Sequence, residues 1–196
     1  MRDILWRTED TRGGYQERIL GSLDELAIVE PRGLNGRPSA IWEAFQQYQN
    51  LPRHNSVPLA EFFRPELMED TAKADMSSLS WIDVANPNPE NYIFHGHRGL
   101  CDVSVFPKYD GIRIGDHPLK RNRYAMIEEY IDCVQARVPR YHEITQIYDG
   151  KSRCYRRALL PAVNNSGDVV KLFMAMRVLE LPNSGTAASI SCRTDQ

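Results

Sequence analysis

The alternation of apolar and polar residues is clearest near the C-terminal end of the chain. In residues 169–179 apolar side chains occupy every second position, from Val170 to Val178, while Lys171 and Arg177 lie on the other face, which is the period of a strand with one buried face. Residues 141–148 alternate in the same way, and residues 154–162 are a further strand candidate. The short segments between these strands are rich in Asn, Gly and Asp, which tolerate the backbone of tight turns. The pattern therefore predicts an antiparallel meander with one apolar face.

Apolar residues at helical spacing predict two amphipathic helices upstream of the meander. The first covers residues 39–50, with Ser39 as its N-cap and Pro52 just beyond its end. Its apolar stripe consists of Ile41, Trp42, Phe45 and Tyr48. The second covers residues 124–138, before Pro139. One side of it carries Tyr124, Ile127, Tyr130, Ile131, Val134 and Val138, and the other carries Glu128, Glu129, Asp132, Gln135 and Arg137.

Shorter elements are predicted between the two helices. Residues 58–68 read as two short helical turns around a proline. Strands are expected at 80–84 and 92–98, joined by an Asn- and Pro-rich loop. Residues 99–120 are broken by glycine and proline into short helical turns and loops.

The two ends of the chain have weaker patterns. We expect residues 1–37 to be a partly ordered N-terminal extension, with a short helix or strand within 19–29, and residues 181–196 to be a flexible tail. Residues 38–180 would then form a single domain, which agrees with a length of 196 residues.

Composition and charge exclude several classes of function. A formal net charge of −2 and the absence of a Lys/Arg cluster argue against a nucleic-acid partner. No apolar run reaches the length of about 20 residues that crosses a bilayer, and the N-terminus lacks the apolar core of a signal peptide. Cys101, Cys133, Cys154 and Cys192 are widely spaced, which favours reduced thiols over disulfides. We therefore predict a cytoplasmic protein with neither membrane nor nucleic-acid contacts.

The order of the predicted elements resembles that of bacterial PAS domains, in particular the standalone type preceded by an N-terminal helix. Trp81-Ile82-Asp83-Val84 and Tyr92-Ile93-Phe94-His95-Gly96 are similar to the first hairpin of that fold. Tyr155 to Pro161, followed by Gly167-Asp168-Val169-Val170, are similar to its last. The resemblance covers residues 41–179. It implies an α+β fold: a five-stranded antiparallel sheet with short helices, one longer helix on its concave side, and the N-terminal helix before it.

The resemblance also implies sensing, with a ligand or partner held between the concave sheet and the longer helix. The side chains it places there are Phe94, His97, Tyr124, Ile127, Ile131, Arg156, Arg157 and Met174. It carries over no catalytic residue. Arg121-Asn122-Arg123-Tyr124 lacks the cysteine of flavin-binding members, and residues 124–138 lack the histidine that usually holds haem. Flavin and haem are therefore not expected, and the ligand stays unidentified.

A prediction about Arg156 and Arg157 does not depend on the family resemblance. Adjacent residues of a strand face opposite sides, so one of the two arginines must face the concave side. A buried guanidinium requires an anionic partner: an internal carboxylate such as Asp83, Glu128 or Glu129, or a carboxylate or phosphate of a ligand. Alternatively, its stem lies on apolar surface while its head reaches water.

Two other functions stay open. The stripe of the first helix could pack on its own domain or on an identical helix, which would make the chain a ligand-free homodimeric adaptor. Asp83 with His95 or His97 could serve a small cone-fold enzyme, although no nucleophile, zinc or phosphate-binding motif is present. His95 and His97 could also share a metal with Cys101, His117 or His142, but ordinary strand histidines explain the pair better. We interpret the chain as a sensory or regulatory domain without catalytic activity.

Overall fold

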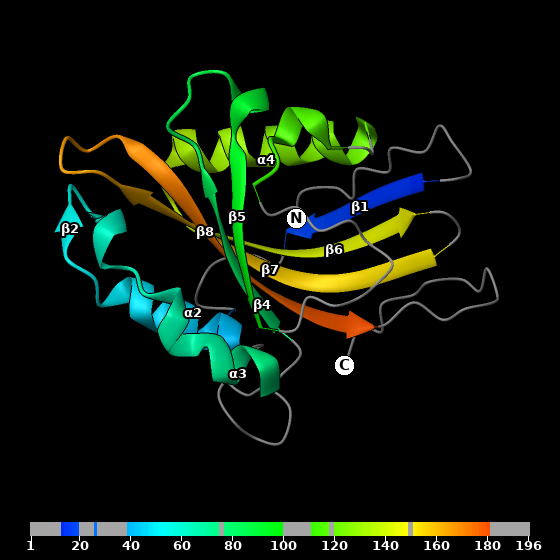
Figure 1. Ribbon diagram of the computed structural model, residues 1–196, viewed down its shortest axis with the longest axis horizontal. Helices are drawn as coiled ribbons and strands as arrows, with labels where there is room; N and C mark the ends of the chain where they lie inside the picture. The colour runs from blue at the N-terminus through cyan, green and yellow to red at the C-terminus, as the bar shows by residue number, and fades with distance from the viewer. Residues whose placement is uncertain are drawn as a thin grey trace.

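A computed structural model of the chain describes residues 13–19, 26, 39–74, 77–99, 111–117, 120–148 and 151–180. Most of the predicted N-terminal extension, residues 100–110 and the predicted C-terminal tail lie outside these ranges. The architecture is mixed α+β, with helices around an antiparallel sheet (Figure 1). None of the helices in the described part of the chain has the length and apolar character needed to cross a membrane.

The main sheet has six strands in the spatial order β1-β6-β7-β8-β4-β5. It is strongly twisted, so that β4 and β5 cross the direction of β1 and β6 steeply in Figure 1. Every pairing within it is antiparallel. Five of the strands are the predicted ones, with somewhat different ends. The strands are β1 (Gly13–Ile19), β4 (Ser77–Asp83), β5 (Ile93–Gly99), β6 (Arg140–Tyr148), β7 (Lys151–Val163) and β8 (Val169–Glu180).

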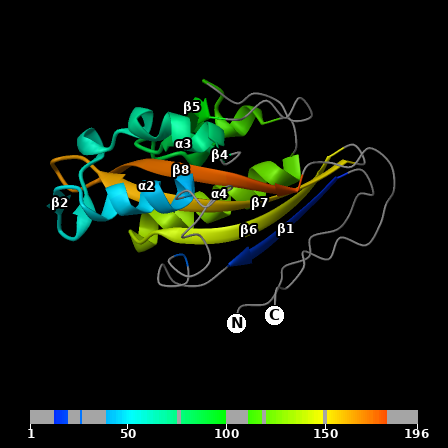
Figure 2. The ribbon, with the colours of Figure 1, turned by 90° about the horizontal axis from the view of Figure 1, so that it is seen from below.

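The sixth strand, β1, lies within the predicted N-terminal extension and was not itself predicted. It pairs with β6 along its whole length, from Gly13 opposite Tyr148 to Ile19 opposite His142, and continues the sheet beyond β6 (Figure 2). Its sequence, GGYQERI, has little apolar alternation. An edge strand can be held by backbone hydrogen bonds to its neighbour. Such pairing does not depend on side chains, so it cannot be predicted from the pattern of apolar residues.

The first predicted helix is confirmed as α2 (Ala40–Gln49). Ser39 caps it, because its hydroxyl accepts a hydrogen bond from the Trp42 N–H at 3.1 Å. After α2 come a small hairpin and short helical turns. They are β2 (Arg53–His54), β3 (Val57–Pro58), η2 (Ala60–Phe62), η3 (Pro65–Met68) and α3 (Glu69–Ala74). The two predicted turns correspond to η2 and η3, while β2, β3 and α3 were not predicted.

Helix α2 and the turns after it cover one face of the sheet. Ile41, Phe45 and Tyr48 are buried in one cluster with Leu160 and Phe173 of the sheet. The ring of Phe63 stacks on Phe173, with a centroid distance of 3.9 Å. Figure 2 shows α2 beside β8 from below.

Helix α4 (Lys120–Ala136) covers the opposite face. Its Met126, Tyr130 and Cys133 are buried against Leu159 and Met174 of the sheet. The short turns η4 (Pro89–Asn91) and η5 (Ile114–Asp116) flank the far edge of the sheet. There the Gly111 N–H donates to the Phe94 carbonyl at 2.7 Å, so the backbone after the undescribed residues 100–110 pairs with β5.

The buried faces of β8 and α4 differ from the predicted ones. Because helices cover both sides of the sheet, the centre of β8 is buried on both faces: Phe173 is 3% exposed and Ala175 is 1% exposed. The sheet-facing side of α4 is only partly the predicted stripe: Tyr130 is buried there, and Ile127 and Val134 pack against the same cluster. Glu129, assigned to the polar side, is buried, whereas Tyr124 and Val138, assigned to the apolar side, are each 44% exposed.

Candidate functional site

A row of four cross-strand neighbours runs over the face of the sheet that α4 covers. Ser78 on β4 lies opposite Met176 on β8, Met176 lies opposite Arg157 on β7, and Arg157 lies opposite His142 on β6. Directly paired residues of neighbouring strands point to the same face. Ser78, Arg157 and His142 are all buried. A polar line therefore crosses a face that is otherwise apolar.

Arg157 connects this row of side chains to helix α4. Its Nη2 donates a hydrogen bond to Oε2 of Glu129 on α4, and the two side chains are 2% and 7% exposed. The same nitrogen lies 3.2 Å from Nδ1 of His142. The guanidinium carbon is 5.7 Å from the ring centroid of Tyr130, also on α4. Arg157 thus holds α4 and β6 together across the interior.

Arg157, rather than Arg156, is the arginine that faces the longer helix. Arg156 lies opposite Glu143 on the other face, where its Nε donates to Glu143 Oε2 at 3.1 Å, and its side chain is 25% exposed. Of the internal carboxylates considered from the sequence, Glu129 is the one that binds the buried guanidinium. The alternative of an arginine head in water does not apply to Arg157, which is only 1% exposed.

Electrostatics keep His142 neutral beside the ion pair. Burial, followed by the positive charge of Arg157, lowers the pKa of His142 to about 3, although Glu129 acts in the opposite direction. Arginine offers only donors, so Nδ1 of the neutral ring accepts and its proton lies on Nε2. Burial also raises the pKa of the nearby Cys133 thiol to about 12. That thiol donates to the Val138 carbonyl at 3.5 Å.

Ser80 adds a second buried hydroxyl to the same face. It lies opposite Met174 on β8, and Met174 lies opposite Leu159 on β7, so this row runs beside the first. Ser80 is 2% exposed, and its Oγ has no hydrogen-bond partner among the residues that the structure describes. A buried hydroxyl without a partner is costly. Ser80 is therefore a candidate contact for a polar atom of a bound molecule.

The structure gathers four of the eight side chains predicted to bind a ligand. Phe94, Ile127 and Met174 belong to the apolar cluster under α4, and Arg157 lies on the same face. Ile131 is half-buried outside that cluster. Tyr124 is largely exposed and Arg156 faces the other side, so the geometry does not bring these two to the site. The side chain of His97 is outside the described part of the chain.

Sequence reasoning missed His142, Ser78 and Ser80 as members of the site and placed Glu129 on the wrong side of its helix. The sequence did contain a pattern that places the two serines on the buried face. Ser78 and Ser80 are two positions apart in a strand that continues with Ile82, so they share its face. No comparable local signal marks His142, because its role depends on which residue of β7 lies opposite.

The residues proposed for the adaptor alternative have other contacts in the folded chain. Ile41, Phe45 and Tyr48 are at most 3% exposed within the single chain. Trp42 alone of the stripe is partly exposed. Side chains already buried against their own sheet cannot also form a dimer contact. The predicted stripe is thus explained by packing within the domain.

The residues proposed for the enzyme alternative are not direct cross-strand partners. Asp83 ends β4, and its Oδ1 accepts a hydrogen bond from the Ala85 N–H at 3.2 Å. His95 lies opposite Trp81, with their ring centroids 5.8 Å apart. Within the described ranges, no group of three or more His, Cys, Asp or Glu side chains is placed to hold a metal ion.

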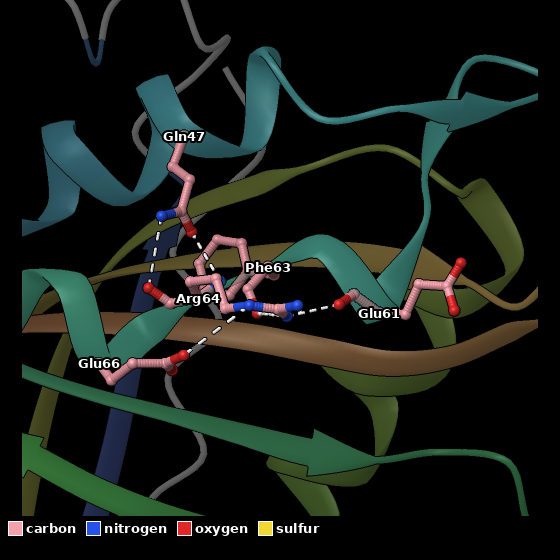
Figure 3. Close-up of polar contacts among 5 residues, drawn as sticks. All are labelled: Gln47, Glu61, Phe63, Arg64 and Glu66. Carbon is pink, nitrogen blue, oxygen red and sulfur yellow. Dashed lines mark hydrogen bonds and ion pairs between the residues drawn. The ribbon is translucent and has the colours of Figure 1, made fainter.

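A second polar cluster, on the surface around Arg64, has a structural explanation (Figure 3). The Gln47 side chain donates to the Arg64 carbonyl at 3.3 Å and accepts from the Arg64 N–H at 3.0 Å. The guanidinium bonds the Glu61 carbonyl and lies 3.9 Å from the Glu66 carboxylate. Both charged side chains are about half exposed, so their pairing contributes little. These contacts fix the turn between η2 and η3 against α2.

No protein-family model matches the chain, and no curated protein matches it. The functional argument therefore rests on the geometry under α4.

Proposed function

We propose that this chain is a cytoplasmic sensory or regulatory domain of the PAS-like type, which binds a small molecule between α4 and the sheet and has no catalytic activity of its own. The observation that carries the proposal is the buried polar row beneath α4, where Arg157 of the sheet holds Glu129 of the helix. A helix needed only for packing would be held more simply by apolar contacts, because replacing a buried ion pair with apolar residues is often neutral or stabilising.

The arrangement of strands supports the same proposal. The five strands that the resemblance covers form one antiparallel sheet in which the first, β4, lies beside the last, β8. The longer helix α4 covers one face of this sheet, and the earlier helix α2 covers the other. A PAS-like sensor would have this arrangement, with its ligand on the α4 side.

The contacts also suggest how binding could be transmitted. Leu159 and Leu160 are adjacent on β7, yet the first belongs to the cluster under α4 and the second to the cluster under α2. Leu172 and Phe173 divide in the same way on β8. A ligand that favours one position of α4 would therefore shift the packing of α2 through these two strands, as a change in population between two states. A protein partner that recognises the α2 side would sense the change.

Native mass spectrometry of the purified chain, before and after denaturation, tests the proposal. We expect a co-purified small molecule that is lost on denaturation, and that is retained less by Ser80→Ala, which removes the buried hydroxyl without adding any atom. Ser56→Ala is the control, because Ser56 is exposed in the β2–β3 turn. The sensor proposal fails if wild-type protein carries no molecule and no compound of a metabolite library stabilises it.

A further inference from the structure

We propose that the site under α4 takes a small molecule bearing a single carboxylate, and that this carboxylate replaces that of Glu129 on Arg157. The inference rests on the proposed function and adds the chemical class of the ligand. It also explains how binding could release α4 from the sheet, because the carboxylate that the ligand displaces belongs to a residue of that helix.

The first step is the requirement of Arg157 for an anion. Its side chain is 2% exposed, and arginine is always charged, so loss of the Glu129 carboxylate without replacement would take an anion in direct contact with Nη2 away from a buried cation. In the folded chain Glu129 meets this requirement from α4. Any movement of α4 that withdraws Glu129 therefore needs another anion at the same position.

The second step is the charge that the position can accept. His142 is neutral and contacts the same Arg157 nitrogen, so it supplies no second positive charge. A monocarboxylate would exchange one for one with the Glu129 carboxylate. A phosphate dianion would bring one negative charge more than the Glu129 carboxylate that it replaces, and a neutral molecule would leave Glu129 in place.

The third step concerns the displaced Glu129. Its neighbours Glu128 and Asp132 are exposed on the outer side of α4. A modest rotation of the helix would therefore carry the Glu129 carboxylate toward water. The Met174 and Met176 side chains lie between the serines and Arg157, and methionine adapts readily to a new neighbour.

The fourth step sets the length of the ligand. Ser78 and Arg157 lie on β4 and β7, with β8 between them. Neighbouring strands are about 4.8 Å apart, so these two positions are separated by about 10 Å. The buried Ser80 hydroxyl lies near the Ser78 end of that span. We therefore infer a compact apolar ligand with a carboxylate at one end and a hydrogen-bonding group at the other.

Calorimetric titration of the full chain with three acids of this shape provides the test: benzoate, 4-hydroxybenzoate and 3-(4-hydroxyphenyl)propanoate. The matched probes are their primary amides, which have the same shape and no charge. In Glu129→Gln the internal competitor is weakened, so we expect at least one acid to bind about tenfold more tightly than to wild type. Glu128→Gln, which changes an exposed neighbour, should bind like wild type, and Arg157→Gln should not bind. The proposal is wrong if no acid gains affinity in Glu129→Gln, or if the amides bind as well as the acids.

A measurement on wild-type protein covers the case in which Glu129→Gln does not fold. With an excess of each acid, amide hydrogen exchange in α4 should become faster as Glu129 leaves Arg157, whereas the amides should leave it unchanged. Unchanged exchange with all three acids would overturn the proposal. The two proposals fail separately: a co-purified molecule without an acid group would overturn the carboxylate assignment and leave the sensory function standing.

Discussion

The Tyr48 hydroxyl of α2 donates a hydrogen bond to the Pro161 carbonyl of β7, 2.8 Å away and 113 positions later in the sequence. Both partners are buried, and burial raises the pKa of Tyr48, so the phenol stays protonated and remains a donor. Proline has no N–H with which to complete the strand ladder. Through this contact α2 is fixed to the strand that carries Arg157 on its other face.

Tyr48→Phe should lower the free energy of unfolding by about 1–3 kcal/mol, because it leaves the buried Pro161 carbonyl without this donor. Urea unfolding followed by circular dichroism measures the change. Tyr124→Phe is the control, since Tyr124 is 44% exposed and its change should stay within about 0.5 kcal/mol. Equal stabilities for the two variants would mean that the hydrogen bond does not hold α2.

Arg157→Met should destabilise the chain by about 3–5 kcal/mol, because it leaves the Glu129 carboxylate buried without its guanidinium. Adding Glu129→Leu should recover most of that loss, since two apolar side chains can pack where the ion pair was. The measurement is the free energy of unfolding for both single variants and the double variant. Additive losses in the double variant would contradict a direct interaction between the two residues.

Stability should fall as the pH is lowered through the range in which histidine normally titrates. His142 has a folded-state pKa of about 3, against about 6.5 in the unfolded chain. Between these values the unfolded state binds the additional proton. The contribution of His142 is therefore complete above about pH 6.5 and is lost progressively below it, amounting to about 2 kcal/mol between pH 7.5 and pH 5.

His142→Gln tests this pH dependence, because glutamine can still accept a hydrogen bond from Arg157 and does not titrate. The variant should show a flatter dependence of unfolding free energy on pH between 7.5 and 5 than wild type. His54→Gln, at a half-buried position in β2, is the matched substitution away from the site. A slope unchanged by His142→Gln would show that another group causes the pH dependence.

Gly96→Ala should destabilise the chain more than Gly111→Ala. Both glycines have positive φ, 62° and 74°, so each substitution costs about 1–2 kcal/mol of backbone strain. A Cβ at Gly96 would lie 2.5 Å from Cζ3 of Trp81, whereas one at Gly111 would meet nothing within 4 Å. The added displacement of the Trp81 ring should cost a further 1–3 kcal/mol or so. Thermal unfolding compares the two variants, and equal midpoints would contradict the close approach.

The sequence alone is enough to predict the elements whose causes are local. Helix α2 follows from the Ser39 cap and the spacing of Ile41, Phe45 and Tyr48, and β8 follows from period-two alternation. It also required that Arg156 and Arg157 face opposite sides of β7. The identity of the family and the function stay predictions.

Which of the two arginines is buried, and which side chains it contacts, depends on the folded chain. Glu129 lies at the edge of the apolar stripe of α4, and a small rotation separates a solvent position from a core position, so helical spacing alone could not place it. The pairing of β1 with β6 and of His142 with Arg157 depends on strand register between distant segments. The polar row under α4 exists only when β4, β8, β7 and β6 lie side by side, and no local pattern specifies that order.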